Sequence, residues 1–225
     1  MGSVKKRVVQ SWSGGKDSAM AHYIASSKMH LYVECLLTTY NESNNRVSMH
    51  GVRLELIERQ AEMLGARLMK IPLPPNCSNE KYEERMMRAL MSLKEEGVGE
   101  VVFGDIFLED VRRYREENLA RAGFKGVFPL WGRDTWELAR EFLKLGFKAL
   151  ICCVDTQQAP AELIGREYSL ELLEKLPDSV DPCGERGEFH TFVYDGPLFP
   201  EPIQFIRGEF VLRDKRFLFM DLVPC

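Results

Sequence analysis

Apolar segments of strand length alternate with amphipathic segments of helical length through the first two thirds of this 225-residue chain. Several of the strand-like segments are apolar without interruption, which is typical of strands buried on both faces. This alternation predicts an α/β fold with a doubly wound, mostly parallel sheet. The expected strands cover residues 4–12, 30–39, 67–73, 99–105, 124–131 and 149–155, and the expected helices cover 17–27, 51–65, 79–97, 108–123 and 135–146.

The character of the chain changes from about residue 166 onward. A segment rich in proline and glycine, LPDSVDPCGERGE, comes before strand-like segments. FVLRDKRFLFMDLV has the pattern of a β-hairpin with its turn at RDKR. We therefore expect an α/β domain over residues 1–165 and a smaller C-terminal α+β portion over residues 166–225.

Charge and composition argue against several classes of protein. The formal net charge of −4 provides no bulk attraction for nucleic acid, so a nucleic-acid partner is not expected. No apolar run approaches the roughly 20 residues of a membrane-spanning helix, and the N-terminal residues are not expected to be a signal peptide. The six cysteines form no C-x-x-C pair, so we expect reduced thiols in a cytoplasmic protein.

The segment QSWSGGKDS, residues 10–18, joins the first expected strand to the first expected helix. It is not a Walker A loop, because Gln10 stands where a glycine is required and Asp17 follows Lys16 where Ser or Thr is required. Glycines let a backbone approach phosphate closely, and the first amides of a helix point toward it. The segment therefore predicts either a phosphate-binding loop or a serine–glycine turn capped by Asp17. The residues of the predicted loop are Ser13, Gly14, Gly15, Lys16, Asp17 and Ser18.

SGGKDS resembles the PP-loop of the N-type ATP pyrophosphatases, a group that includes GMP synthetase, NAD synthetase and argininosuccinate synthetase. Three later segments resemble the diphthine–ammonia ligase family and its close prokaryotic relatives: FGDIFLEDVRRYREE, FPLWGRDT and CGERGEFHTFVYDGPLF. The resemblance implies a Rossmann-like fold of the adenine nucleotide alpha hydrolase type. It also implies that residues 1–165 form the ATP-binding PP-loop domain and residues 166–225 a substrate-binding portion.

By this resemblance, the loop holds the β- and γ-phosphates of ATP as they leave together, and a carboxylate is adenylated at the α-phosphate. Ammonia then displaces AMP, since a carboxylate has no leaving group until it is activated. Mg²⁺ would offset the charge on the departing pyrophosphate. In the best-known members the carboxylate belongs to diphthine on translation elongation factor two. The implied partners are ATP, Mg²⁺, free ammonium and that factor, and a homodimer is left open.

Polar residues follow several of the expected strands. The expected strands end at Ser13, Thr38–Thr39, Asp105, Trp131 and Asp155. Ligands of open parallel sheets bind beyond the carboxyl ends of the strands, so these ends are expected at one rim. Thr38 and His50 are candidates for nucleotide contacts, although His50 is equally well explained as structural. Asp105 is a candidate to bind Mg²⁺ or substrate, or to cap the next helix, and one of Arg113 and Arg115 is expected to reach the site.

Two further segments contain candidate catalytic residues. The guanidinium of Arg133 suits phosphate or carboxylate, whereas Asp134 is equally well explained as a helix cap. A proline–glycine loop that leads into a strand contains Glu185, Glu188 and His190. These residues could hold Mg²⁺, deprotonate ammonium or bind a cationic substrate. The alternative is an acidic surface turn. The predicted catalytic residues are Asp105, Arg133, Glu185, Glu188 and His190, and the predicted metal ligands are Asp17, Asp105 and Glu185.

The chain departs from the family pattern at two positions of GERGEFHTF. Members that act on diphthine typically carry Asn or Gly at the position of Arg186 and Glu at the position of His190. These departures leave the acceptor open while affecting the amide-forming chemistry less. The alternatives are another carboxylate acceptor, tRNA modification by a PP-loop enzyme, or an ATP-binding module without catalysis.

Overall fold

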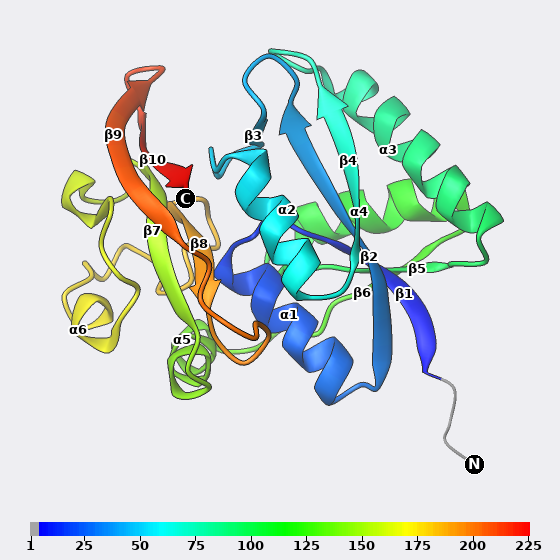
Figure 1. Cartoon of the computed structure of the whole chain (residues 1–225), viewed down its shortest axis with the longest axis horizontal. Coiled ribbons are helices and arrows are strands. Elements are labelled where there is room, and N and C mark those ends of the chain that lie inside the picture. Colours follow the sequence, from blue (N-terminus) through cyan, green and yellow to red (C-terminus); the bar gives the residue numbers. More distant parts are fainter. Residues whose placement is uncertain (1–4) are drawn as a thin grey trace.

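The chain folds into two β-sheets, A and B, that meet at the N-terminus of one helix (Figure 1). The computed structural model describes residues 5–225, so residue 4, where the first strand was expected to begin, lies outside the described residues. In sheet A, β4, β2, β1, β5 and β6 are parallel neighbours in that order, and the short β3 runs antiparallel to β2. The strands of sheet A are β1 (Lys6–Ser11), β2 (Leu31–Asn41), β3 (Arg46–Val47), β4 (Arg67–Leu73), β5 (Glu100–Val102) and β6 (Lys125–Val127).

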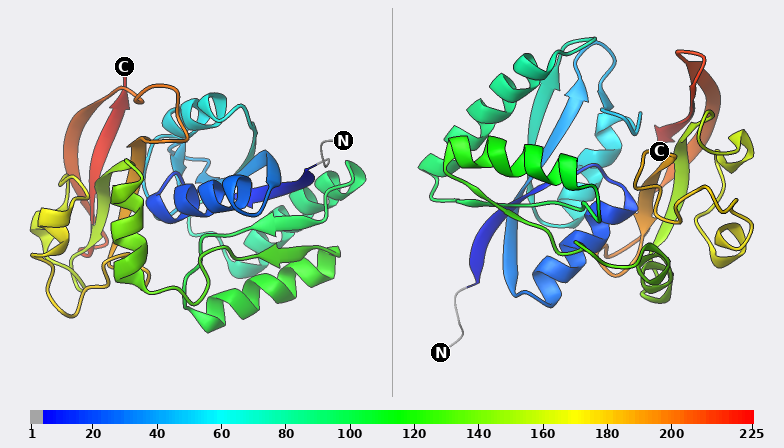
Figure 2. Two further views of the ribbon diagram at one scale, coloured as in Figure 1. Left: turned by 90° about the horizontal axis from the view of Figure 1, so that it is seen from below. Right: turned by 180° about the vertical axis from the view of Figure 1, so that it is seen from behind.

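Helices cover both faces of sheet A (Figure 2). Adjacent residues of β1 point to opposite faces, so Val8 packs into the core beneath α1 and α2 whereas Val9 packs into the core beneath α3 and α4. This arrangement confirms the predicted doubly wound, mostly parallel sheet. No helix within residues 5–225 is both long and apolar enough to cross a bilayer. The covering helices are α1 (Lys16–Ser27), α2 (Leu54–Met63), α3 (Asn79–Glu95) and α4 (Glu109–Ala122).

Sheet B is antiparallel and includes a strand that was expected elsewhere. Its order is β8-β7-β10-β9, with β7 (Lys148–Asp155), β8 (Phe189–Asp195), β9 (Phe205–Arg213) and β10 (Phe217–Pro224). The prediction that residues 149–155 belong to the parallel sheet is therefore wrong, and Asp155 does not join the rim of sheet A. A continuous apolar run indicates burial on both faces but not the identity of the neighbouring strands. The division of the chain after residue 165 stays a prediction, and the change of sheet falls before β7.

Segments on both sides of β7 explain why that strand is apolar throughout. Helix α5 (Thr135–Lys144) precedes β7, and η1 (Ala161–Leu163) and α6 (Leu170–Leu173) follow it. Side chains of β7 share one core with Phe142 of α5 and with Tyr168. Burial beneath these elements, rather than membership of sheet A, therefore accounts for the apolar run.

The predicted hairpin at RDKR is confirmed. Arg213 of β9 pairs with Phe217 of β10, and the turn between them is formed by Asp214 and Lys215. Both turn residues have positive φ angles, 53° and 52°, as a type I′ turn requires. Such a turn follows the natural twist of antiparallel strands and fixes their register.

An ion pair fastens this hairpin to β7. The Asp155 carboxylate, only 1% exposed, accepts hydrogen bonds from the Arg216 guanidinium at 2.6–3.0 Å and from the Gln158 amide at 2.6 Å. Hydrogen bonding by Arg216 is the main cause that holds the pKa of Asp155 at about 2, against an ordinary value of 3.8. The folded state therefore favours the ionised carboxylate.

We expect this pair to stabilise the protein above about pH 4 and to lose its effect as the pH falls to about 2, because the carboxyl is protonated only below its folded-state pKa. Asp155→Asn should cost about 1–2 kcal/mol at neutral pH and much less near pH 2. Thermal unfolding of both proteins between pH 2 and 7 measures the difference, with Asp178→Asn as an exposed control. An Asp155→Asn effect of the same size at every pH would contradict the assignment.

Candidate active site

The glycine loop follows β1 and passes directly into α1. Gly14 has a φ of 79°, and a Cβ at this position would lie 2.7 Å from Oε1 of Gln60, so a larger residue would fit neither the conformation nor the space. The hydroxyls of Ser13 and Ser18 lie 3.3 Å apart across the loop. The amides of Asp17 and Ser18 belong to the first turn of α1, where the helix itself provides no acceptor. The loop thus presents hydroxyl and amide donors at the positive end of a helix.

Sheet B and α2 hold this loop in place. The amide of Lys16 donates to Oγ1 of Thr191 at 3.0 Å, and the amide of Val193 donates to the Gly14 carbonyl at 2.9 Å. The side-chain amide of Gln60 donates to the carbonyls of Gly14 and Val193 at 3.1 and 2.7 Å. Its oxygen accepts the indole N–H of Trp12 at 2.8 Å. Since the glutamine is fully buried, the loop is held by bonds that exclude water.

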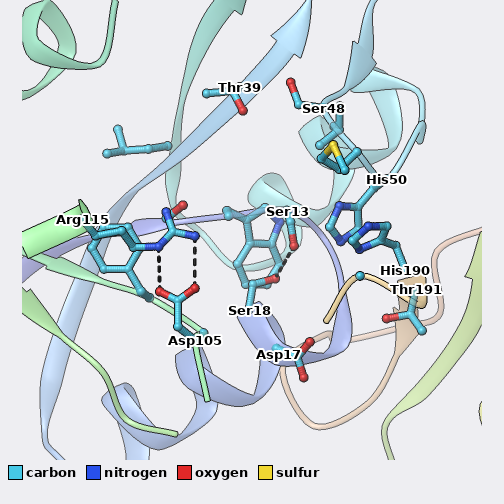
Figure 3. A pocket seen from close by; sticks show the side chains of 18 of the residues that line it. Ser13, Asp17, Ser18, Thr39, Ser48, His50, Asp105, Arg115, His190 and Thr191 are labelled. Carbon is cyan, nitrogen blue, oxygen red and sulfur yellow. Dashed lines mark hydrogen bonds and ion pairs between the residues drawn. The ribbon is translucent and has the colours of Figure 1, made fainter. Parts of the chain in front are cut away.

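A cavity of about 600 Å³ opens beside the loop, between the rim of sheet A and β8 (Figure 3). It brings together residues that are far apart in the sequence and that were predicted to share one site. The predicted residues that line it are Ser13, Lys16, Asp17, Ser18, His50, Asp105, Glu185 and His190. The loop, the two imidazoles and the carboxylates therefore face the same space.

Other predicted residues make contacts away from this cavity. Thr38 is fully buried, and its hydroxyl donates to the carbonyl of Trp12 at 2.8 Å. Arg133 pairs with Glu141 at 2.7 Å. Glu188 is 2% exposed and accepts the amide of Asp181 at 3.0 Å. The cavity lining includes none of Thr38, Arg133, Glu188, Gly14 and Gly15, and their roles at the site stay predictions.

Helix capping explains the position of Asp134. Its carboxylate accepts the amide of Glu137 at 2.9 Å, so it is the N-cap of α5. Of the two roles that the sequence left open for Asp134, the structure shows the cap.

The cavity also includes residues that the sequence left as one of two choices or did not single out. Arg115, rather than Arg113, reaches the site and pairs with Asp105 at 2.7 Å. Thr39 and Ser48 line the cavity, whereas Thr38 points into the core. Thr191 lies in the TF of the segment that carries the family resemblance, and this was the available signal for it.

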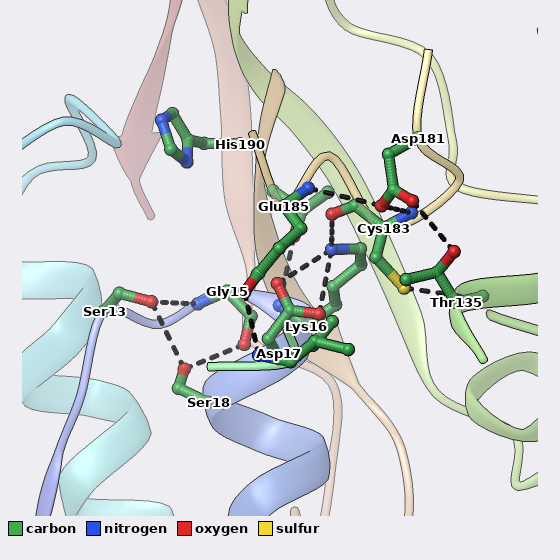
Figure 4. Close-up of polar contacts among 12 residues, drawn as sticks. Ser13, Gly15, Lys16, Asp17, Ser18, Thr135, Asp181, Cys183, Glu185 and His190 are labelled. Atoms are coloured by element: carbon green, nitrogen blue, oxygen red, sulfur yellow. Dashed lines mark hydrogen bonds and ion pairs between the residues drawn. The ribbon is translucent and has the colours of Figure 1, made fainter. Parts of the chain in front are cut away.

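The carboxylates of the cavity differ in their surroundings (Figure 4). Oε1 of Glu185 accepts the amide of Ile106 at 2.8 Å. Burial is the main cause that raises the pKa of Glu185 to about 7. The Ile106 amide lowers this pKa, and the nearby carboxylates of Asp17 and Asp105 raise it. Within residues 5–225, no group of three or more Asp, Glu, His or Cys side chains lies in an arrangement that could hold a metal ion by itself.

Two imidazoles lie side by side at the same end of the cavity. The ring centroids of His50 and His190 are 4.5 Å apart. Burial lowers the pKa of His190 to about 4 and that of His50 well below 6.5, so both rings are neutral at neutral pH. Within the described residues, Nδ1 of His50 and Nε2 of His190 have no hydrogen-bond partner. Neutral rings of this kind can accept a proton from an incoming nucleophile.

The fold and the loop together define an α/β protein of PP-loop type whose pocket is completed by an antiparallel sheet. Family models described as the diphthamide synthase N-terminal and C-terminal domains match residues 6–126 and 134–218. The chain therefore belongs to the diphthamide synthase family. This confirms the resemblance and the expected class of enzyme, an ATP-dependent ligase.

Two curated relatives agree with this assignment. The diphthine–ammonia ligase of Rattus norvegicus is 28% identical over 92% of this chain and 85% of its own length. That of Danio rerio is 30% identical over 88% of this chain and 85% of its own length. A solved structure, described as a predicted subunit of tRNA methyltransferase from Methanocaldococcus jannaschii, aligns at 18% identity with a TM-score of 0.44, covering 64% of this chain and 80% of that one.

Gly104 provides a test of the loop geometry. A Cβ on Gly104 would lie 2.8 and 2.9 Å from the carbonyl carbon and oxygen of Asp17, which are backbone atoms that move only with the first turn of α1. We expect Gly104→Ala to displace that turn and to weaken ATP binding about tenfold or more. Isothermal titration calorimetry with ATP measures the change.

Gly99 is the matched control, because it precedes the same strand, β5, and a Cβ there would meet no atom within 4 Å. Gly99→Ala should bind ATP as the parent chain does. Equal affinities for the two alanine variants would contradict the proposed role of the first turn.

Proposed function

We propose that this chain is an amide ligase that forms AMP and pyrophosphate, adenylating a carboxylate and then transferring ammonia to it. The observation that carries the proposal is the meeting of loop hydroxyls, three carboxylates and two neutral imidazoles in one cavity. The loop supplies donors for phosphate, the carboxylates suit a divalent cation, and the imidazoles suit an uncharged nucleophile. This combination fits activation followed by amide formation.

In the activation step, an oxygen of the acceptor carboxylate attacks the α-phosphorus of ATP. The bond from the α-phosphorus to the bridging oxygen breaks, and pyrophosphate leaves. The amides of Asp17 and Ser18 and the hydroxyls of Ser13 and Ser18 would hold the negative charge of the leaving group. The guanidinium of Arg115, oriented by Asp105, adds positive charge at the opposite wall.

We propose that the carboxylates of the cavity contact a magnesium ion only together with phosphate, because the described side chains form no metal site by themselves. The negative charges of Asp17 and Asp105 raise the pKa of Glu185, after the effect of its burial, and a divalent cation would relieve this repulsion. Mg²⁺ is usually held by one or two carboxylates together with substrate phosphates and water. When bound, it offsets the charge that develops on the pyrophosphate. Asp17, Asp105 and Glu185 are the residues that would hold it.

In the second step, the nitrogen of ammonia attacks the acyl carbon, AMP departs with one oxygen of the former carboxylate, and the nitrogen loses a proton. His190 and His50 are neutral and lack internal partners at one ring nitrogen each, so either ring is able to receive that proton. Free ammonium in solution is the proposed source of nitrogen.

We propose diphthine as the acceptor, as the names of the relatives suggest, carried on translation elongation factor two as the family resemblance implies. The predicted cytoplasmic location fits this substrate, and all six cysteines are free thiols. A second candidate is a different carboxylate acceptor. It is favoured by His190, which contributes a neutral ring to the cavity where members that act on diphthine typically carry a glutamate.

The test is to incubate the chain with ATP, ammonium and purified elongation factor two that carries diphthine. We expect equal amounts of AMP and pyrophosphate by chromatography, and a decrease of about one mass unit in the factor as OH is replaced by NH₂. Products of ADP and phosphate, or ATP binding without any turnover, would contradict the ligase. Turnover with other carboxylates but not with the factor would select the second candidate.

A pair of variants distinguishes a loss of activity caused at the site from a general effect on the protein. Glu185→Gln removes a carboxylate that lines the cavity, and AMP formation should fall about 100-fold or more. Glu201→Gln changes an exposed carboxylate and should leave AMP formation unchanged. If both variants kept full activity, Glu185 would have no part in the reaction.

A further inference from the structure

The Lys16 side chain points away from the hydroxyls of the glycine loop and toward Cys183 (Figure 4). Lys16 is the first residue of α1 and is only 4% exposed. Its ammonium lies 2.9 and 2.8 Å from the two carboxylate oxygens of Asp17 and donates to the carbonyl of Cys183. An ammonium has three donors, so these three acceptors account for all of them.

The surroundings of the ammonium keep it in this position. The rings of Tyr168 and Phe189 lie with their centroids 5.8 and 5.6 Å from Nζ, within the range of cation–π attraction. Burial is the largest single influence and lowers the pKa of Lys16, but Asp17, Cys183 and Glu185 together outweigh it, so the pKa is raised. Turning the side chain toward a phosphate would leave a carboxylate and a carbonyl without their donor in a region of low dielectric.

Cys183 belongs to the segment of residues 181–185, which is also held in place by hydrogen bonds to Asp181. Asp181 accepts the amides of Cys183 and Glu185 at 2.9 and 3.3 Å, and it also accepts the hydroxyl of Thr135 at 2.8 Å. The two amide bonds hold the turn of the segment, and the bond from Thr135 ties the segment to α5. The bond from Lys16 ties the same segment to the glycine loop, two residues before Glu185 enters the cavity.

We propose that Lys16 is a positioning residue that fastens the 181–185 segment, and with it Glu185, onto the glycine loop, and that it is not a phosphate ligand. A lysine in a glycine-rich loop is ordinarily assigned to the phosphates. Here its ammonium joins the two halves of the site. The proposal rests on the proposed function, because it takes the cavity to be a site that binds ATP. Its test does not require the protein to catalyse a reaction.

Lys16→Met provides the test, with two readouts. The first is the ratio of the Kd for AMP to the Kd for ATP, measured by calorimetry. If Lys16 binds the β- or γ-phosphate, its loss weakens the binding of ATP but not that of AMP, and the ratio falls. If Lys16 only positions the segment, the ratio stays within about threefold of the parent value. The second readout is alkylation of Cys183 by iodoacetamide, mapped by mass spectrometry.

Cys183 is suited to report on the segment, because it is 3% exposed and its thiol contacts the carbonyl of Thr135 at 3.3 Å. In Lys16→Met the segment should loosen, and Cys183 should react about tenfold faster or more. Cys152 and Cys153, fully buried in β7, should stay protected in both proteins, which distinguishes local opening from unfolding.

Either of two results would overturn the proposal: a fall of tenfold or more in the preference for ATP, or a Cys183 that remains as protected as in the parent chain. If Lys16→Met exposes Cys152 and Cys153 as well, Lys16→Gln is judged by the same criteria, since its amide retains a donor for the Cys183 carbonyl. A parent chain that binds ATP without forming AMP would refute the ligase but leave both readouts intact.

Discussion

A single buried glutamine joins the parts of this protein on which the site depends. Gln60, from α2, hydrogen-bonds the glycine loop at Gly14, the end of β1 at Trp12 and strand β8 at Val193. The bond from Lys16 to Thr191 makes a second link between loop and sheet B. Removing either link would leave buried polar groups without partners, so the loop can take its conformation only when the second sheet is docked. The cavity is consequently a product of both sheets.

This docking explains the electrostatic character of the cavity. Sheet A contributes the loop with Asp17 and, after β5, Asp105. Sheet B and the segment before it contribute His190 and Glu185. Burial, with a further contribution from the nearby acidic groups, raises the pKa of Glu185 toward neutrality, and burial keeps the imidazoles uncharged. A site that must bind a polyphosphate with a cation on one side and an uncharged nucleophile on the other requires this separation of charge.

Local patterns in the sequence predicted the parallel sheet, the loop and the position of Asp105 beside it, because periodicity and the position of parallel strand ends are sufficient for these predictions. Glu185 was assigned to the same site through the segment that resembles the family. The partners of β7 could not be predicted, since a strand buried on both faces has the same pattern in either sheet. Whether Thr38 or Thr39 faces the cavity depends on the side of the sheet to which each residue of β2 points. Two adjacent threonines do not indicate which side that is. Gln60 gave no signal, because the backbone groups it binds are 46 and 133 residues away.

An ¹⁸O-labelling experiment tests most directly whether the reaction occurs at the α-phosphate of ATP while the loop holds the β- and γ-phosphates. With ¹⁸O in the carboxylate of an acceptor that supports turnover, an acyl-adenylate route transfers one labelled oxygen to AMP. We predict AMP heavier by about two mass units, together with unlabelled pyrophosphate. Unlabelled AMP, or ¹⁸O recovered in inorganic phosphate beside ADP, would contradict the account.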